Sequence, residues 1–356
     1  MNALSDKAEG VRRAFRDQAD ACARLGSPFT QRLCNLLAER MDDTAAVFAR
    51  VLSWPGDPSL RADSLPLRLC GALHGLVLAG RDAALAQAYP PNGAGDESLW
   101  QAVAAAARAH APAILARLAS PPQTNEVRRA AVLLPGFLEI ARQYPGRPLI
   151  ASELGASAGL NMNWDRYRYR LGDLAWGAAD SPVLLAPEWR GKPVPAPAAA
   201  VSVAEKAGCD LNPLDASAPD DRLCLLSYIW ADQADRLALA RAALEMRDRF
   251  PVRVERADAV DWLARRLATP RAGAIHVVYH SIAWQYFPEA ARQAGEVLLF
   301  AAGARATPEA PLAWLRFEDD GRGPGASLRL VTWPGGADRE LARADHHGRW
   351  VEWHGP

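Results

Sequence analysis

The segment from Pro148 to Asn161 holds the residue types that most clearly indicate a ligand site. It reads as an apolar strand that ends near Glu153 and continues through small residues between Gly155 and Gly159. Glycine permits a tight turn and a close approach of a ligand to the backbone. In a doubly wound sheet such a turn lies outside the carboxyl end of its strand, where ligands bind. The segment supplies five candidate cofactor residues: Glu153, Gly155, Ser157, Gly159 and Asn161.

Two kinds of cofactor compete for this turn. A dinucleotide site requires G-x-G-x-x-G, whereas the sequence from Gly155 reads G-A-S-A-G, so the second glycine is out of register. The spacing of Glu153, Gly155 and Gly159 resembles the E/D-x-G-x-G-x-G motif of class I S-adenosylmethionine-dependent methyltransferases, with Ser157 in place of the middle glycine. That resemblance implies S-adenosylmethionine as the cofactor. An ordinary tight turn between a strand and a helix would give the same local pattern.

Two acidic residues follow later predicted strands. The methyltransferase resemblance implies acidic side chains at the ends of the second and third strands, which would hold the ribose and the adenine of the cofactor. Asp210 follows the strand expected near residue 200, and Asp258 follows the strand that ends at Arg256. Each aspartate alone also fits a helix cap or a solvated loop. Together with the glycine turn, in this order, they favour a cofactor site.

The fourth predicted strand leads directly into His280, with Ser281, Gln285 and Tyr286 just after it. In this architecture that edge of the sheet would face the reacting carbon of the cofactor. A histidine there could act as a base or orient a nucleophile. We therefore predict His280 and Tyr286 as catalytic residues. A buried histidine held by structural hydrogen bonds is the alternative.

A second resemblance covers nearly the whole chain. The sequence resembles the bacterial DUF2332 family in five motifs, taken in order: Pro122–Val127, Glu153–Asn161, Trp164–Tyr167, Gly208–Asp215, and Trp333–Gly336 with His347-Gly348. The chain departs from the family at Arg128, where the family pattern has glycine. This difference affects the expected packing of the nearby helix and not the expected site. The resemblance implies a fold more than an activity.

Four residues are predicted to contact the substrate. The family resemblance implies that a helix starting near Asn125 faces the cofactor cleft, with Glu126 and Arg129 in its first turn. A capping residue followed by a glutamate also suits any helix start. Tyr167 belongs to an aromatic alternation that predicts a hairpin beside the cofactor turn, either as a lid or as one packed face.

Ser157 supports a rival interpretation. The residues Gly155 to Gly159 also have the G-x-S-x-G spacing of a hydrolase nucleophile, and Asp258 and His280 follow in the order of a triad. Such a turn normally follows the fifth strand of its sheet, whereas everything before residue 145 reads as helix. A third possibility is a non-catalytic sensor or scaffold with a nucleotide-binding fold, because a fold alone does not establish chemistry.

No metal site is predicted. The five cysteines are dispersed and form no C-x-x-C pair, which favours buried, reduced thiols in a cytoplasmic protein. His346 and His347 are adjacent and would point to opposite faces of a strand. A hairpin turn at His347-Gly348 explains them better than a metal centre does.

These residues require a particular set of elements around them. Residues 1–145 are rich in Ala, Leu and Arg with apolar residues every three or four positions, which predicts a helical domain that covers the cleft. Residues 146–356 alternate strands with helices, which predicts an α/β, Rossmann-like, doubly wound and mainly parallel sheet. A hairpin is inserted around 165–178, the tail forms antiparallel strands, and Lys192–Ala200 is a Pro/Ala-rich connector. The strands expected before the tail are Arg147–Leu154, Ala199–Ala204, Val252–Arg256, Ala274–Tyr279 and Leu312–Phe317.

Composition excludes several classes of partner. The 356 residues carry 41 basic and 41 acidic side chains, so the formal net charge is zero, which argues against binding to nucleic acid or a membrane surface. The longest stretch without Asp, Glu, Lys or Arg, Ala272–Pro288, is too short and too polar to span a bilayer. The first fifteen residues have no apolar core of a signal peptide, so we expect a cytoplasmic protein. The cofactor motif and the neutral net charge favour a small molecule as its substrate.

Overall fold

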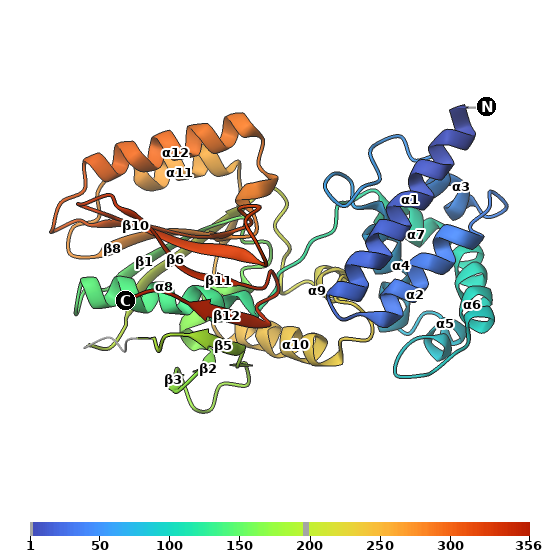
Figure 1. The fold of residues 1–356 in the computed structure, drawn as a ribbon, viewed down its shortest axis with the longest axis horizontal. Helices are drawn as coiled ribbons and strands as arrows, with labels where there is room; N and C mark the ends of the chain where they lie inside the picture. The colour runs from blue at the N-terminus through green and yellow to red at the C-terminus, as the bar shows by residue number, and fades with distance from the viewer. Residues whose placement is uncertain (1–2, 195–198) are drawn as a thin grey trace. The chain divides into compact units, whose positions relative to one another are not determined.

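The computed structural model describes residues 3–194 and 199–356, and it divides into two compact units (Figure 1). The first unit contains the chain up to Thr124 together with Ala218–Ala238. The second contains Asn125–Ser217 and Leu239–Pro356. The chain therefore leaves the first unit, begins the second, and returns to the first before the second is complete.

The first unit is helical. Its helices bury apolar stripes around a core that includes Phe15, Leu37 and Leu73. Ser27 and Asp82 cap two of them by accepting hydrogen bonds from the backbone N–H groups of the first turn. The helices are α1 (Ala3–Arg24), α2 (Pro28–Arg40), α3 (Ala46–Leu52), α4 (Leu65–Leu78), α5 (Ala83–Ala88), α6 (Asp96–Ala109), α7 (Ala111–Leu118) and α9 (Pro219–Ser227).

The second unit is built on a large, mainly parallel sheet, as the sequence predicts. Its nine strands follow the order β5-β12-β11-β10-β9-β8-β1-β6-β7, and the five from β9 to β7 run parallel. The strands are β1 (Leu149–Leu154), β5 (Glu188–Gly191), β6 (Val203–Asp210), β7 (Val254–Arg256), β8 (Ile275–Ser281), β9 (Leu312–Glu318), β10 (Ala326–Trp333), β11 (Asp338–Ala344) and β12 (Trp350–Trp353). Numbered along the chain, the parallel strands have the order 3-2-1-4-5, which reverses direction between β1 and β8. Ligands bind at such a reversal in doubly wound sheets.

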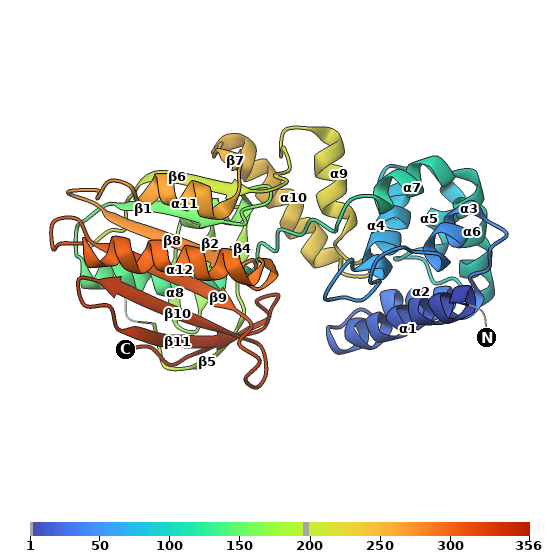
Figure 2. The ribbon, with the colours of Figure 1, turned by 90° about the horizontal axis from the view of Figure 1, so that it is seen from above.

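Helices cover both faces of this sheet. Helices α11 (Ala259–Leu267) and α12 (Glu289–Ala304) lie on one face, over a core that includes Trp262, Trp314 and Trp333 (Figures 1 and 2). Helix α8 (Arg129–Gln143) lies on the other face, where Gly136 approaches Leu315 so closely that a Cβ there would meet its side chain at 2.4 Å. Helix α10 (Ala234–Arg249) precedes β7.

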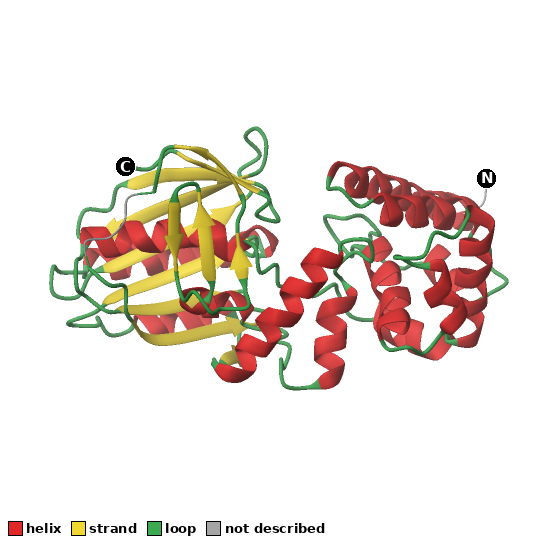
Figure 3. Cartoon of the chain, turned by 90° about the horizontal axis from the view of Figure 1, so that it is seen from below, coloured by secondary structure: helices red, strands yellow, loops and turns green. Residues whose placement is uncertain are grey.

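A small sheet lies on the same side as α8. It has the order β3-β2-β4 and is formed by β2 (Arg168–Leu171), β3 (Leu174–Trp176) and β4 (Leu184–Leu185) (Figure 3). The antiparallel pair β2–β3 is the hairpin that the sequence predicts around 165–178. The parallel partner β4, and β5 at the edge of the large sheet, are not evident in the sequence because both are short and lack alternation.

Two differences from the sequence-based expectation concern element placement. The predicted strand at Ala199–Ala204 lies largely before β6, because Glu205 and Lys206 inside β6 are paired with Arg266 and Asp165 and conceal the apolar pattern. Helix α8 belongs to the second unit, so the N-terminal segment of the first unit reaches Thr124 and not residue 145. Nearly all of α8 is buried, and periodicity cannot tell which core a helix joins. Of the Lys192–Ala200 connector, residues 195–198 lie outside the described residues.

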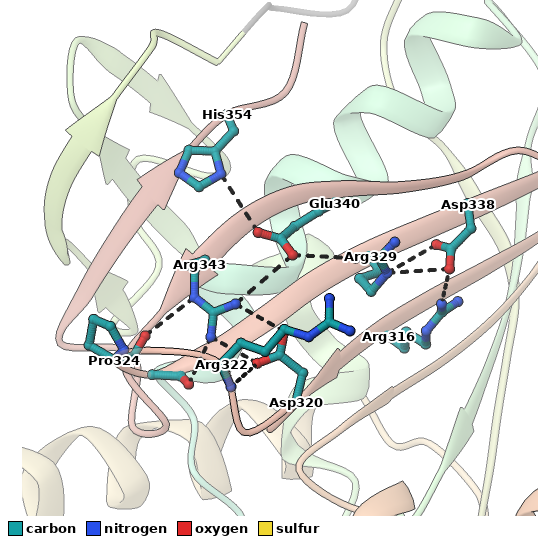
Figure 4. A network of polar contacts seen from close by, with 10 residues as sticks. Arg316, Asp320, Arg322, Pro324, Arg329, Asp338, Glu340, Arg343 and His354 are labelled. Atoms are coloured by element: carbon teal, nitrogen blue, oxygen red, sulfur yellow. Dashed lines mark hydrogen bonds and ion pairs between the residues drawn. The ribbon is translucent and has the colours of Figure 1, made fainter.

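The antiparallel strands carry a continuous network of ion pairs (Figure 4). Arg316 on β9 and Arg329 on β10 share the carboxylate of Asp338 on β11, and Arg329 also contacts Glu340. Arg343 pairs with Asp320 at 2.9 Å. Among the described residues, no helix combines the length and the apolarity needed to cross a membrane.

Candidate functional site

A pocket opens at the carboxyl ends of β1, β6 and β7. It measures about 480 Å³ when the open space at its mouth is counted. Gly155, Asp210 and Asp258, which the sequence singles out, lie in its wall together. The other lining residues come from the ends of β6 and β7, the start of α11 and the segment leading into α12: Cys209, Leu211, Ala257, Ala259, Val260, Phe287, Pro288 and Ala291.

The glycine turn has a backbone that only a few residue types accept. Gly155, Ser157 and Gly159 have φ values of +69°, +52° and +74°. The backbone N–H groups of Gly155 and Ala156 donate to the carbonyl of Cys209 at 2.9 and 3.0 Å, which ties the turn to the end of β6. A Cβ on Gly155 would lie 2.6 Å from Cβ of Ala283, so the chain itself requires glycine there.

The two aspartates of the pocket are held by backbone hydrogen bonds. Asp210 accepts from the N–H of Ser157 at 2.9 Å through Oδ2 and from that of Asn212 at 2.9 Å through Oδ1. Asp258 is the N-cap of α11 and accepts from Val260 and Asp261 through Oδ1 at 2.8 and 3.2 Å. These hydrogen bonds are compatible with ligand binding, because they fix the direction of each carboxylate at the pocket wall.

The charge of the pocket is negative. Among its described lining residues, the ionisable side chains are those of Asp210, Asp258 and Cys209. Burial raises the pKa of the Cys209 thiol to about 12, so that group is neutral at physiological pH. Two carboxylates without a lysine or arginine in the same wall disfavour a phosphate and favour a ligand with cationic, amine or hydroxyl groups.

The turn does not lead into an α-helix. It continues as η1, a 3-10 helix over Leu160–Arg166, and the N–H of Leu160 donates to Oδ1 of Asn125 at 2.9 Å. The aligned peptide dipoles and unpaired N–H groups that bind a pyrophosphate at a helix start are therefore missing from the described turn. This feature, like the charge, argues against a dinucleotide.

Glu153 lies beneath the turn and does not line the pocket. It is 2% exposed, and its Oε2 accepts a hydrogen bond from the hydroxyl of Tyr279 at 3.2 Å. Burial raises the pKa of Glu153 to about 8, against smaller lowering effects of Tyr279 and Arg129. Glu153 is therefore largely protonated at neutral pH. It is a candidate cofactor residue of the sequence motif, and it is absent from the described pocket wall.

The predicted substrate residues at the start of α8 contact the segment that follows the glycine turn. Besides the contact of Asn125 with Leu160, the side chain of Asn161 donates to the carbonyl of Glu126 at 3.1 Å. Oδ1 of Asn161 is buried without a hydrogen-bond partner in the described part of the chain. Arg129 donates to the carbonyls of Ser281 and His346 at 3.2 and 3.0 Å, which joins α8 to the end of β8.

Tyr167 is part of the core. It is fully buried, and its hydroxyl donates to the carbonyl of Leu160 at 2.5 Å. Its neighbour Trp164 stacks on Phe137 of α8, with ring centroids 4.0 Å apart. Of the two interpretations of the aromatic alternation, the packed face describes this arrangement.

His280 and Tyr286 occupy very different positions. His280 is fully buried, with Nδ1 2.6 Å from Oε1 of Glu318 and Nε2 3.0 Å from the indole nitrogen of Trp314. An indole N–H only donates, so Nε2 is the acceptor and Nδ1 carries the proton. Both nitrogens are engaged, which disfavours a general base and favours a positioning role. Tyr286 is 66% exposed and follows in the 3-10 helix η2 (Trp284–Tyr286).

The hydrolase triad is not assembled in this structure. His280 is occupied by Glu318 and Trp314, and Asp258 caps α11. The glycine turn follows β1, the first strand of the large sheet. Within the described residues, no group of three or more His, Cys, Asp or Glu side chains could hold a metal ion.

Sequence reasoning missed several residues that shape the site. Leu211, Phe287 and Ala291 line the pocket, and Leu211 is 62% exposed although it is apolar. Its place directly after Asp210 was an available signal, because exposed leucines at the end of a parallel strand are candidates for ligand contact. Glu318 organises the loop after β8 but lies at the end of β9, and no local motif marks it.

Residues 12–353 match the sequence profile of DUF2332, described as an uncharacterized protein conserved in bacteria. The chain belongs to this family. Searches among curated proteins and among solved structures found no match. The function of this DUF2332 member must therefore be argued from its own geometry.

Proposed function

We propose that the second unit binds S-adenosylmethionine and that the chain is a transferase that uses this cofactor, in its simplest form a small-molecule methyltransferase. The observation that carries the proposal is that Gly155, Asp210 and Asp258 share one pocket at the carboxyl ends of β1, β6 and β7. The 3-2-1-4-5 order of the parallel strands supports it, because this order places that pocket beside the reversal between β1 and β8.

The negative charge of the pocket favours S-adenosylmethionine over NAD and ATP as the ligand. S-adenosylmethionine carries a sulfonium and an ammonium group against one carboxylate, and it has no phosphate. NAD and ATP would bring phosphates to a wall whose described charged groups are Asp210 and Asp258. Like charges at close range oppose binding, whereas a cation beside a carboxylate favours it.

Each lining residue has a defined part in this proposal. Asp210 and Asp258 would accept hydrogen bonds from hydroxyl and amino groups, and Leu211 and Phe287 would cover the flat ring of the cofactor. The bound cofactor supplies an electrophilic methyl carbon on sulfur. The contribution of the chain is to orient an acceptor toward that carbon and to exclude water. Transfer of an aminocarboxypropyl group or a cyclisation would use the same pocket.

The acceptor is expected on the side of α8. Asn125, Glu126, Arg129 and Asn161 form a hydrogen-bonded cluster with the chain after the glycine turn, next to the end of β8. His280 positions the loop after β8, and Tyr286 is exposed at its end. In this assignment His280 acts through Glu318 and the loop, and it does not accept a proton from the substrate.

Calorimetry with S-adenosylhomocysteine, S-adenosylmethionine, NAD and ATP tests the proposal. We expect saturable binding of the first two and none of NAD or ATP. Asp258→Asn keeps an N-cap residue but removes the charge, so it should weaken S-adenosylmethionine binding about tenfold, or roughly 1.4 kcal/mol. Asp261→Asn, in the same helical turn but outside the pocket wall, is the matched control. Tighter binding of NAD or ATP, or equal losses in both variants, would contradict the proposal.

A non-catalytic sensor with the same cofactor pocket is the second candidate. The engagement of both nitrogens of His280 favours it, because the loop after β8 contains no histidine that could act instead. Incubation with S-adenosylmethionine and a panel of small-molecule acceptors distinguishes the two. Formation of S-adenosylhomocysteine or methylthioadenosine above the uncatalysed rate indicates an enzyme, and binding without consumption of S-adenosylmethionine indicates a sensor.

A further inference from the structure

The helical unit contains a cavity of its own. It measures about 390 Å³ when the open space at its mouth is counted. Its wall comes mainly from α2, α4 and the segment after α9, and Tyr89, Pro122 and Thr124 complete it. These parts are far apart in the sequence, near residues 30, 70 and 230. The chain thus leaves the second unit after β6 and contributes part of this wall before it returns.

Two hydrogen bonds to one carboxylate fix that wall. The carboxylate of Asp232 accepts hydrogen bonds from the hydroxyl of Ser27 at 2.5 Å and from the backbone N–H of Phe29 at 2.8 Å. Asp232 therefore stabilises the start of α2 and holds the segment after α9 beside it. Hydrogen bonds thus hold together the elements that form the wall of this cavity.

The wall is aromatic, and it carries no acidic side chain, lysine or arginine among the described residues. Phe29, His74, Tyr89, Tyr228 and Trp230 contribute rings, and Phe29 packs edge-on against Tyr89 with centroids 4.7 Å apart. An ionised ligand would lose its hydration there without gaining a counter-ion, so the wall selects against charge.

Two hydroxyls in this wall have no partner. Tyr89 is 1% exposed and Tyr228 is 8% exposed, and the hydroxyl of each is buried without a hydrogen bond in the described part of the chain. Buried hydroxyls are nearly always paired, so an unpaired one requires an explanation. Here two of them belong to residues of the same cavity. A ligand with a hydrogen-bonding atom would satisfy groups that the protein leaves unpaired.

We propose that this cavity binds a small, uncharged aromatic molecule that carries a hydroxyl or carbonyl group. The rings of the wall would contact the flat part of the ligand, and Tyr89 and Tyr228 would bond its polar atom. This site is independent of the cofactor pocket, since all of its lining residues belong to the first unit.

Three related probes test the proposal on the full-length chain. Phenol has the ring and the hydroxyl, toluene has the ring alone, and benzoate has the ring with a charge. Trp230 lines the cavity, so its fluorescence and ligand-observed NMR report on occupancy. We expect saturable phenol binding, at least fivefold weaker toluene binding and no benzoate binding. Equal binding of phenol and toluene would overturn the proposal, because water would then suffice for the hydroxyls.

Substitutions identify the site. Tyr89→Phe and Tyr228→Phe should each weaken phenol binding about threefold to tenfold, whereas the ligand-free protein should keep or raise its melting temperature, because an unpaired buried hydroxyl is removed. Tyr286→Phe, at an exposed hydroxyl, is the control. Unchanged phenol affinity in both variants would contradict the proposal.

A filling substitution gives an independent measurement. Leu67 lines the cavity and is half-buried, so Leu67→Trp should abolish phenol binding. Leu60→Trp adds the same ring at a residue that is 50% exposed and outside the wall, and it should bind phenol as the parent chain does. Equal phenol affinity in Leu67→Trp and Leu60→Trp would exclude this cavity as the site.

Discussion

The imidazole of His280 and the carboxylate of Glu318 are joined through Nδ1 and Oε1 at 2.6 Å, across the neighbouring strands β8 and β9. The same carboxylate accepts hydrogen bonds from the backbone N–H groups of Ala283 and Trp284 at 3.0 and 3.1 Å. Although burial opposes it, these donors hold the pKa of Glu318 below its ordinary value. The pair thus fixes the loop that leads from β8 to Phe287 in the pocket wall.

The first prediction follows from this pair. His280→Gln should lower the free energy of unfolding by roughly 2–3 kcal/mol, because the partners of a fully buried ring lose their hydrogen bonds. Urea unfolding measures the change, with His354→Gln at an exposed histidine as the control. A variant with unchanged stability and a loss of turnover of about 100-fold or more would restore His280 as a general base.

The second prediction concerns pH. Glu153 has a pKa of about 8 in the folded chain, against an ordinary value of 4.5. Between these values the folded state holds a proton that the unfolded state has released. The stabilisation that this proton gives to the folded chain is therefore fully present below about pH 4.5. The free energy of unfolding then falls as the pH rises toward 8, by at most about 1.4 kcal/mol per pH unit.

Glu153→Gln removes this dependence while keeping an oxygen that can accept from Tyr279. We expect the variant to gain stability over the parent chain progressively from pH 5 to pH 8 in chemical unfolding experiments. A difference between the two proteins that stays constant over this range would show that Glu153 is ionised in the folded state.

The elements that the sequence predicts well are those with strong local signals. Helix α11 begins directly after Asp258 because aspartate is a good N-cap, and its apolar residues Leu263 and Leu267 have helical spacing. Strand β6 is displaced in the prediction because Glu205 and Lys206 occupy its centre. Their partners, Arg266 and Asp165, come from other parts of the chain, and local reasoning cannot supply them.

The candidate site also contains residues that the sequence predicts and residues that it cannot predict. Gly155, Asp210 and Asp258 lie at strand ends, so the topology of a parallel sheet brings them together once the strand order is assumed. Ala291 belongs to the first turn of α12 and carries no functional group that a motif could reveal. The hydrogen bonds to both ring nitrogens of His280 come from Glu318 and Trp314. Only the pairing of β8 with β9 brings these two residues beside His280.

The third prediction tests the ion-pair network of Figure 4. Asp338 contacts both Arg316 and Arg329. Arg316 is mostly buried and reaches Asp338 through Nη2, whereas its Nη1 has no hydrogen-bond partner in the described residues. Asp338→Asn should therefore cost about 1 kcal/mol of stability, and less at high salt because screening weakens the remaining charges. Glu289→Gln, in an exposed pair on α12, should change stability less. Equal effects in both variants would mean that the network adds nothing beyond isolated pairs.

The fourth prediction locates the cofactor. Ala291 lines the pocket and is partly exposed in the first turn of α12, whereas the adjacent Ala290 is exposed and lies outside the wall. Ala291→Phe should fill the pocket and weaken S-adenosylhomocysteine binding at least about tenfold, and Ala290→Phe should leave it within about twofold of the parent chain. Gly155→Val is a poorer test, since a side chain there would collide with Ala283 before it met any ligand.

The same pair of variants also separates binding from folding. A ligand that binds only the folded state raises the melting temperature by mass action, so S-adenosylhomocysteine should stabilise Ala290→Phe and not Ala291→Phe. Without ligand, the two variants should melt within a few degrees of each other, because both substitutions add a ring at a surface of the same helical turn. Retention of the ligand-induced shift in Ala291→Phe would place the cofactor elsewhere, and loss of it in both variants would point to a disturbed α12 instead of a filled pocket.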